Sequence, residues 1–402
     1  MLNGRHEGAA YDAVILGGGV VGLAAARELA SRRLSVALVE RGAVGRESSW
    51  AAGGMLAPQC EADAPDDFFR LACAARDRYP DFAAELREET GIDMELDETG
   101  TLYLATTEED AREIGRRFDW QSRARLAVER LTADEARAVE PQVSPRALGA
   151  LRFPRDWQVE NRRLTEALRR GCELGGVRIH EHTPALSINA ERGRVASVET
   201  GRGKIRAGAV VVACGAWSSQ VPISTPGGGE GVGRRGVQID NDAAAVRVEP
   251  VRGQMLSFET GGEPFVRHVI YGPRGYLVPR REGRLLAGST SERAGFDKSV
   301  TEEGRASVAA HAAELAPAVA GLKLAEAWAG LRPRGEDDWP VVGESAEVEN
   351  LFYATAHYRN GILLAPLTGA LLADVIVNRT ASPLLAPFSP TRLRRAATLG
   401  AG

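Results

Sequence analysis

The stretch Val14-Ile-Leu-Gly-Gly-Gly-Val-Val-Gly22, near the N-terminus, decides the fold of this chain. Residues 13–16 are apolar and predict a buried parallel strand, and apolar residues then recur with helical spacing over 20–30. A second apolar run, 35–39, predicts another strand, and Glu40 follows it directly. Strand, glycine turn, helix, strand and acid together form the βαβ pattern that binds dinucleotides.

The three glycines of the motif have separate physical roles. Gly17 permits the tight turn, Gly19 lets the backbone approach a pyrophosphate, and Gly22 lets the helix pack closely on the strand. The helix N-terminus offers free N–H groups and a partial positive charge to the phosphates. Glu40 stands where a ribose hydroxyl needs an acceptor. The motif therefore predicts a dinucleotide but does not distinguish NAD from FAD.

The composition is that of an ordinary globular chain. Its 402 residues suffice for two domains, 44% of them are hydrophobic and 26% are charged. The net charge of −4 gives no reason to expect a nucleic-acid or membrane partner. No CxxC spacing and no metal-like pairing with histidine occurs among the cysteines, which are Cys60, Cys73, Cys172 and Cys214. We therefore expect reduced thiols, no metal site and a cytoplasmic protein.

Two terminal segments bear on the location of the protein. The polar residues 1–10 leave no room for the apolar part of a secretory signal before the first strand. The longest apolar stretch, 361–377, contains Pro366 and Asp374 and is short for a membrane span. It predicts a buried helix of a large domain.

The remaining patterns predict two discontinuous domains. Helical patterns over 66–90 and 108–123 show no βαβ rhythm, which returns with a helix over 161–174 and a buried strand over 209–214. Residues 246–289 alternate with the period of an antiparallel sheet. We therefore expect the α/β class, with a doubly wound, Rossmann-like nucleotide domain and a mixed, largely antiparallel β-sheet substrate domain. The first is expected to comprise residues 11–57, 150–221 and 327–380, and the second residues 58–149 and 222–326.

A second match to the glycine motif, Gly231-x-Gly233-x-x-Gly236, lacks the flanking elements. Pro226 precedes it in place of a strand, and the strand-like residues 237–239 follow it in place of a helix. We interpret it as part of a mobile surface loop, and not as a second nucleotide site.

Three stretches resemble the glycine oxidases of the thiamine pathway, within the FAD-dependent D-amino-acid and sarcosine oxidase superfamily. They are Ser48-Ser-Trp-Ala-Ala-Gly-Gly-Met-Leu-Ala-Pro58, Trp328-Ala-Gly-Leu-Arg-Pro333 and His357-Tyr-Arg-Asn-Gly-Ile-Leu-Leu364. From the residues alone, the first stretch fits a flexible loop as well as a close approach to a ligand. The resemblance extends from about residue 12 to residue 380. It implies an FAD enzyme that acts on a small amino acid with O₂ as electron acceptor, and a homo-oligomer, namely a homotetramer.

The resemblance also implies where the cofactor lies. The pyrophosphate is expected on the helix that begins at Val20, the adenosine ribose at Glu40 and the flavin ring beneath residues 357–363. The residues expected to bind FAD are Gly17, Gly19, Val20, Val21, Gly22, Glu40, Arg41, Ser48, Ser49, Gly53, Gly54, Met55, Ala185, His357, Tyr358, Arg359, Asn360, Gly361, Ile362 and Leu363. Relatives that attach flavin covalently use a cysteine in the C-terminal third, and this chain has none after Cys214, so non-covalent FAD is expected.

The catalytic site is expected around Arg332, which by the same resemblance binds the substrate carboxylate, with Tyr276 and Arg359 lining the site. A buried carboxylate needs a fixed cationic partner, and arginine supplies a bidentate one. The alternation around Tyr276 also fits a core residue, and Arg359 also fits a structural salt bridge or a flavin contact. No catalytic acid or base is obligatory, because the flavin carries the hard chemistry.

Several functions remain open at this point. The leading hypothesis is oxidative deamination of glycine and other small amines or D-amino acids, with an imine product and hydrogen peroxide, supplying glycine imine for the thiazole of thiamine. The alternatives are a D-amino-acid dehydrogenase or sarcosine-oxidase type of enzyme, and a non-catalytic flavin-binding subunit. Two departures stand out: an insertion over 224–245, and Asn161 where the resemblance predicts a proline, which we interpret as a variation of the helix start.

Overall fold

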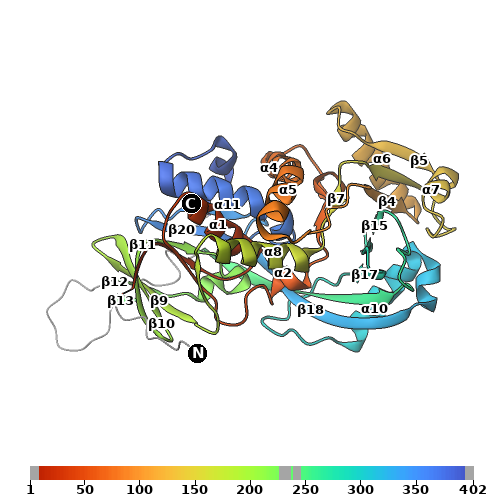
Figure 1. Ribbon diagram of the computed structural model, residues 1–402. Helices are drawn as coiled ribbons and strands as arrows, with labels where there is room; N and C mark the ends of the chain where they lie inside the picture. Colours follow the sequence, from red (N-terminus) through yellow and green to blue (C-terminus); the bar gives the residue numbers. More distant parts are fainter. Residues whose placement is uncertain (1–8, 226–236, 239–245, 394–402) are drawn as a thin grey trace.

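The computed structural model describes residues 9–225, 237–238 and 246–393. Figure 1 shows two β-sheets side by side, with helices packed over the first. The second glycine motif and most of the expected insertion lie outside the described residues.

The first sheet has the predicted parallel centre. Five strands run parallel in the order β8–β2–β1–β11–β20, so that the strand of the glycine motif lies in the middle. This is the strand order of a Rossmann-like unit, and it confirms the predicted α/β class. The strands of this sheet are β1 (Ala10–Leu16), β2 (Val36–Val39), β8 (Arg178–His180), β9 (Ala185–Glu191), β10 (Arg194–Thr200), β11 (Gly203–Val212), β12 (Ile223–Thr225), β13 (Val237–Gln238), β19 (Val341–Glu344) and β20 (Leu351–Thr355).

Alternate residues of this sheet enter two different cores. Ala13 and Ile15 pack in a core formed with helices, whereas Val14 and Leu16 pack in a core formed with β9 and β10 on the opposite face. The helices of the first core are α1 (Val20–Ser31), α4 (Asp67–Asp77), α5 (Tyr79–Thr90), α8 (Asn161–Leu174) and α11 (Gly361–Asn378). The expected division of the chain assigns α4 and α5 to the substrate domain, and here they pack beside α1, α8 and α11.

Helix α11 lies in the core of the first unit. It is the one helix in the described part of the chain that is long and apolar enough to cross a membrane. However, 61% of that stretch is buried, and α11 packs against α1 and α4. These contacts are those of the buried core helix that its sequence predicts.

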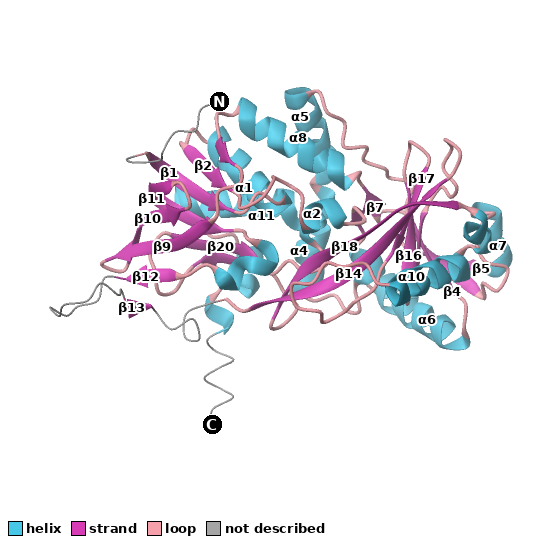
Figure 2. Ribbon diagram, turned by 90° about the horizontal axis from the view of Figure 1, so that it is seen from below, coloured by secondary structure: helices cyan, strands magenta, loops and turns pink. Residues whose placement is uncertain are grey.

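The second sheet is largely antiparallel, as predicted. Its order is β18–β14–β17–β16–β15–β4–β6–β5, and β15–β4 is its parallel pair. Strands β14 and β18 pair from Val248↔Gly335 to Glu259↔Lys323 and extend from the first unit into the second (Figure 2). Its elements are β4 (Thr101–Ala105), β5 (Glu129–Thr132), β6 (Gly149–Phe153), β14 (Val248–Glu259), β15 (Val269–Gly272), β16 (Gly275–Pro279), β17 (Arg284–Gly288) and β18 (Lys323–Gly335), with α6 (Glu108–Arg123), α7 (Ala133–Val139) and α10 (Glu302–Leu315).

Two predicted segments differ in their bounds. The helical pattern over 66–90 forms two helices, because Pro80 in the first turn of α5 has no N–H to continue the hydrogen bonds of α4. Strand β15 begins only at Val269, although the alternating pattern over 246–289 also includes the residues before it. The backbone N–H groups of Arg267 and His268 donate to the Glu140 carboxylate, at 2.8 and 3.2 Å, and so take no part in a strand ladder.

Candidate functional site

One cavity brings together nearly all of the predicted site residues, although they come from segments as far apart in the chain as Gly17 and Ile362. It lies where the carboxyl ends of β1, β2 and β11 meet the segment 48–57 and strands β14, β16 and β18. The predicted residues that line it are Gly17, Gly19, Val20, Val21, Glu40, Arg41, Ser48, Ser49, Gly53, Gly54, Met55, Ala185, Tyr276, Arg332, His357, Tyr358, Arg359, Asn360, Gly361 and Ile362. Gly22 and Leu363 do not line it.

The two predicted residues outside the cavity have structural positions. A Cβ atom added at Gly22 would lie 2.0 Å from the carbonyl oxygen of Gly17, so Gly22 permits the close packing of α1 on the glycine turn. The side chain of Leu363 is 1% exposed and belongs to the helical core.

The entrance to α1 is held by side chains from elsewhere in the chain. The Glu40 carboxylate accepts hydrogen bonds from the N–H groups of Gly18 and Gly42, both at 2.8 Å. Ser49 Oγ accepts from the N–H of Val20 at 2.9 Å and thereby caps the helix. The first turn of α1 itself carries no acidic residue, and the positive end of the helix dipole faces the cavity. This arrangement fits a pyrophosphate at the helix and a ribose near Glu40.

The segment 48–57 is anchored and does not form a free loop. Residues Ser48–Ala51 form a single helical turn, α2, and Ser48 Oγ donates to the carbonyl oxygen of Leu331 on β18. The ring of Tyr276 approaches Gly53 so closely that a Cβ added at Gly53 would lie 3.2 Å from it. Small residues therefore allow backbone from the first unit to meet the second sheet at the cavity wall.

Arg332 is partly buried, and its charge has no carboxylate partner among the described residues. Its guanidinium donates to the carbonyl oxygen of Thr290 at 3.1 Å and to Ser289 Oγ at 2.6 Å. Among the described residues, no carboxylate oxygen lies within 4.0 Å of it. Burial lowers the pKa of Arg332 from its ordinary value. A cation held in this way favours a small anion such as a carboxylate in the cavity.

A glycine on the neighbouring strand makes room for this arginine. Gly253 on β14 lies opposite Gly330, and a Cβ added there would lie 2.3 Å from the guanidinium nitrogens of Arg332. Any other residue at position 253 would displace the guanidinium from its place in the cavity wall.

Tyr276 and Arg359 line the same cavity. Tyr276 is 6% exposed, its hydroxyl donates to Met255 Sδ at 3.2 Å, and its ring stacks on Tyr271 with centroids 6.2 Å apart. Arg359 Nη2 lies 3.6 Å from Glu61 Oε1, and this neighbouring carboxylate raises the pKa of Arg359. Arg359 thus both lines the cavity and forms an ion pair with Glu61.

The residues before α11 shape the opposite wall. His357 is buried, which lowers its pKa to about 4, and its Nε2 lies 3.1 Å from Thr368 Oγ1. The imidazole is therefore neutral at physiological pH. The N–H of Tyr358 donates to the carbonyl oxygen of Pro333 at 2.9 Å, which ties this wall to the strand of Arg332.

Several cavity residues are not foreseen from the sequence. Trp217 follows β11, and its ring lies 3.6 Å from the guanidinium carbon of Arg41. The position of β11 beside β1 is a usable signal, because ligands bind at the carboxyl ends of such strands. Glu61 and Met255 have no local pattern that marks them, since only the folding of distant segments brings them to the cavity.

The cysteine that lines the cavity is an unsuitable nucleophile. Burial raises the pKa of Cys214 to about 12, so its thiol stays protonated, and it donates to the carbonyl oxygen of Leu16 at 3.3 Å. The described residues contain no group of three His, Cys, Asp or Glu side chains suited to a metal ion.

Comparisons with known proteins agree with this geometry. A family model described as FAD dependent oxidoreductase matches residues 12–375. The chain is 38% identical over 385 residues to the glycine oxidase of Geobacillus kaustophilus, covering 95% of this chain and 97% of that protein. The crystal structure of glycine oxidase from Geobacillus kaustophilus superposes with a TM-score of 0.87 at 36% identity, over 96% of this chain and 99% of that chain.

A third relative has a longer chain. The bifunctional protein ThiO/ThiG of Synechocystis is 33% identical over 387 residues, which are 95% of this chain and 54% of that protein. The long family match, the identities above 30% and the pyrophosphate-compatible helix lead to one conclusion. The chain belongs to the FAD dependent oxidoreductase family, and FAD is its cofactor.

Proposed function

We propose that this protein is a glycine oxidase, which oxidatively deaminates glycine and other small amines or D-amino acids. Bound FAD would supply the redox chemistry: it would accept a hydride from the substrate Cα at N5, which leaves an imine, and would pass the two electrons, with two protons, to O₂ as hydrogen peroxide. The relatives named glycine oxidase, matched over almost their whole length, support this substrate class.

The observation that carries the proposal is the uncompensated charge of Arg332 in the cavity wall. An α-amino acid offers a carboxylate to this guanidinium, which fixes the substrate at one end. Tyr276 and Arg359 then confine the amine and Cα, and Glu61 holds Arg359 in place. The neutral His357 adds no charge beside the cofactor. These three, Arg332, Tyr276 and Arg359, are our proposed substrate-site residues.

We propose that FAD lies along the cavity without a covalent bond. The free N–H groups of α1 suit its pyrophosphate, Glu40 suits the adenosine ribose, and residues 357–362 lie at the flavin end. The protonated thiol of Cys214 supports non-covalent attachment. The chain's division, with residues 11–57, 150–221 and 327–380 as FAD-binding domain and residues 58–149 and 222–326 as substrate domain, also remains our proposal, with the difference that helices α4 and α5 pack on the first unit.

The place in metabolism follows from a relative's name. The bifunctional ThiO/ThiG protein joins a region similar to this chain to a second part. We propose that the imine formed from glycine supplies thiazole synthesis for thiamine in the cytoplasm, and that the protein forms a homotetramer. Size-exclusion chromatography with light scattering tests the oligomer, and a mass of one chain would contradict it.

The decisive experiment is an assay of the purified protein in air. We expect the purified protein to show a flavin absorption spectrum and acid precipitation to release the flavin. We also expect it to form peroxide from glycine, sarcosine and D-alanine. Absence of flavin would contradict the whole proposal. Substrate that bleaches the flavin anaerobically, without peroxide in air, would instead support a dehydrogenase that passes electrons to a quinone.

A further inference from the structure

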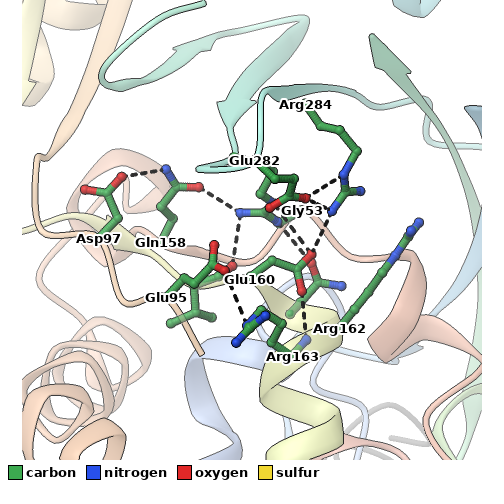
Figure 3. A network of polar contacts seen from close by, with 12 residues as sticks. Gly53, Glu95, Asp97, Gln158, Glu160, Arg162, Arg163, Glu282 and Arg284 are labelled. Carbon is green, nitrogen blue, oxygen red and sulfur yellow. Dashed lines mark hydrogen bonds and ion pairs between the residues drawn. The ribbon is translucent and has the colours of Figure 1, made fainter. Parts of the chain in front are cut away.

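A buried arginine outside the cavity is bonded to the cavity wall. Arg280 follows β16 and is 3% exposed. Through Nη1 it donates to Gln158 Oε1 at 2.8 Å and to the carbonyl oxygen of Val159 at 3.1 Å. Through Nη2 it donates to the carbonyl oxygen of Gly53 at 2.9 Å and to Asn161 Oδ1 at 3.0 Å. Figure 3 shows Gly53 and Gln158 gathered in this network.

Asn161 continues the network to the rest of the same wall. Its Nδ2 donates to the carbonyl oxygens of Ser49 and Trp50 at 2.8 and 3.1 Å, and the side chain is 1% exposed. The carbonyl oxygens of a helical turn have no partner within it at its C-terminal end. Here side chains supply those partners. Asn161 donates to two carbonyl oxygens of α2, and Trp328 Nε1 donates to the carbonyl oxygen of Ala51 at 3.1 Å.

This observation corrects our interpretation of Asn161. A proline is sterically acceptable as the first residue of α8, so the departure resembles a simple variation of the helix start. Yet the Asn161 amide makes three side-chain hydrogen bonds, none of which a proline can make. The residue therefore has a role that reaches beyond its own helix.

The charge of Arg280 is retained within the network. Burial lowers the pKa of Arg280 to about 10, so the group is still a cation at neutral pH. Glu160 Oε1 lies 3.8 Å from its Nε, and the same carboxylate oxygen lies 3.5 Å from Nη2 of Arg284. Arg284 thus shares the anion with Arg280, and no hydrogen bond in the described structure joins it to residues 48–54.

We propose that Arg280 and Asn161 are positioning residues, which fix the backbone of residues 49–53 as the wall of the FAD cavity; this inference rests on the proposed function. Tyr276 lies on the strand that ends before Arg280, and a Cβ added at Gly53 would lie 3.2 Å from its ring. One strand therefore reaches the same backbone segment at two points. The planar guanidinium serves four acceptors at once, which a lysine ammonium with its single nitrogen cannot do.

The test compares Arg280→Lys with Arg284→Lys, which is the same substitution beside the same Glu160. The apoprotein of each variant is titrated with FAD, and the dissociation constant is measured from the quenching of flavin fluorescence. We expect Arg280→Lys to weaken FAD binding about tenfold or more and to shift the absorption maxima of the bound flavin. Arg284→Lys should bind FAD as the wild type does. Asn161→Ala provides a second variant, with the same expected loss, if Arg280→Lys does not fold.

The outcomes separate this inference from the proposed function. If Arg280→Lys and Asn161→Ala lower the unfolding temperature but bind FAD like Arg284→Lys, with an unchanged spectrum, their role is merely structural and the inference is wrong. If the wild type binds FAD but forms no peroxide from glycine, the proposed function fails while the positioning role is still measured by FAD affinity. Restored affinity in Asn161→Gln, relative to Asn161→Ala, would further support the amide's role.

Discussion

Arg332 illustrates how one residue can depend on a partner that the protein itself does not supply. Among the described residues its guanidinium donates to neutral acceptors, Ser289 and Thr290, and has no carboxylate within 4.0 Å; burial lowers its pKa. The bound substrate carboxylate would complete the charge pair. Loss of that ion pair should therefore change the substrate affinity more than it changes the free energy of unfolding.

We predict that Arg332→Ala weakens the apparent affinity for glycine by about 3–5 kcal/mol, because it leaves a buried carboxylate without its cation. Steady-state peroxide assays over a wide glycine range measure this loss. The matched control is Arg334→Ala on the same strand, where a partly exposed arginine pairs with Asp338 outside the cavity. Equal affinities in Arg332→Ala and the control would refute Arg332 as the carboxylate anchor.

The raised pKa of Asp156 should make the free energy of unfolding depend on pH. Burial raises its pKa from 3.8 to about 7, against the opposing hydrogen bond from the N–H of Cys60 and the charge of Arg76. Between pH 4 and 7 the native side chain therefore keeps a proton that the unfolded chain has lost. The unfolding free energy should fall as pH rises through this window, by on the order of 4 kcal/mol.

Asp156→Asn should remove that part of the pH dependence, because an amide does not titrate. Urea unfolding of the wild type and the variant at several pH values between 4 and 8 measures the difference. The difference in unfolding free energy between the wild type and the variant should become smaller as pH rises to 7. If the unfolding free energies of the two proteins instead changed in parallel with pH, the prediction of a raised pKa for Asp156 would be wrong.

At the scale of elements, helix α1 is defined by its contacts with other segments. Ser49 caps its first N–H, and Gly22 packs against the glycine turn. Because a Cβ at Gly22 would meet a backbone oxygen, the neighbour cannot rotate away as a side chain could.

We predict that Gly22→Ala destabilises the apoprotein by about 1–3 kcal/mol or more, by forcing α1 away from β1. Gly115→Ala is the matched control, since Gly115 lies within α6 and a Cβ there would have nothing within 4 Å. That variant should stabilise the protein by about 0.5–1 kcal/mol, since alanine favours helix more than glycine does. Urea unfolding compares the two, and an unperturbed Gly22→Ala would contradict the packing role.

At the scale of the whole molecule, the cavity joins two sheets that the chain enters in turn. Glu40 and Ser49 reach it from the first unit, and Tyr276 reaches it from the second. A ligand that occupies the cavity therefore binds only when both units are folded and in place.

We predict that removal of FAD lowers the unfolding temperature, because FAD at one hundred times its dissociation constant adds about 2.7 kcal/mol of stability. Calorimetry of apoprotein and holoprotein measures the shift. Hydrogen exchange should show slower exchange on FAD binding in β1 and α1 and also in β14 and β18. Protection confined to the first unit would contradict a cavity shared by both.

The sequence by itself determined the elements whose signals are local. The βαβ unit follows from apolar spacing and glycines, and the helices Glu108–Arg123 and Asn161–Leu174 have the predicted ends. The FAD family followed from specific strings of residues, and this identification is confirmed. These features are readable because neighbouring residues alone create the periodicity, the caps and the motif.

Only the tertiary structure decided which distant residues meet. Glu61 reaches Arg359, Gly253 makes room for Arg332, and the Asn161 amide holds the turn of α2. None of these contacts leaves a trace in local spacing, because each joins segments that are far apart in the chain. Gly253 meets Arg332 through the register of β14 with β18, and Asn161 meets α2 through the packing of α8. Burial likewise depends on the complete fold, and burial is what shifts the pKa values of Asp156 and His357.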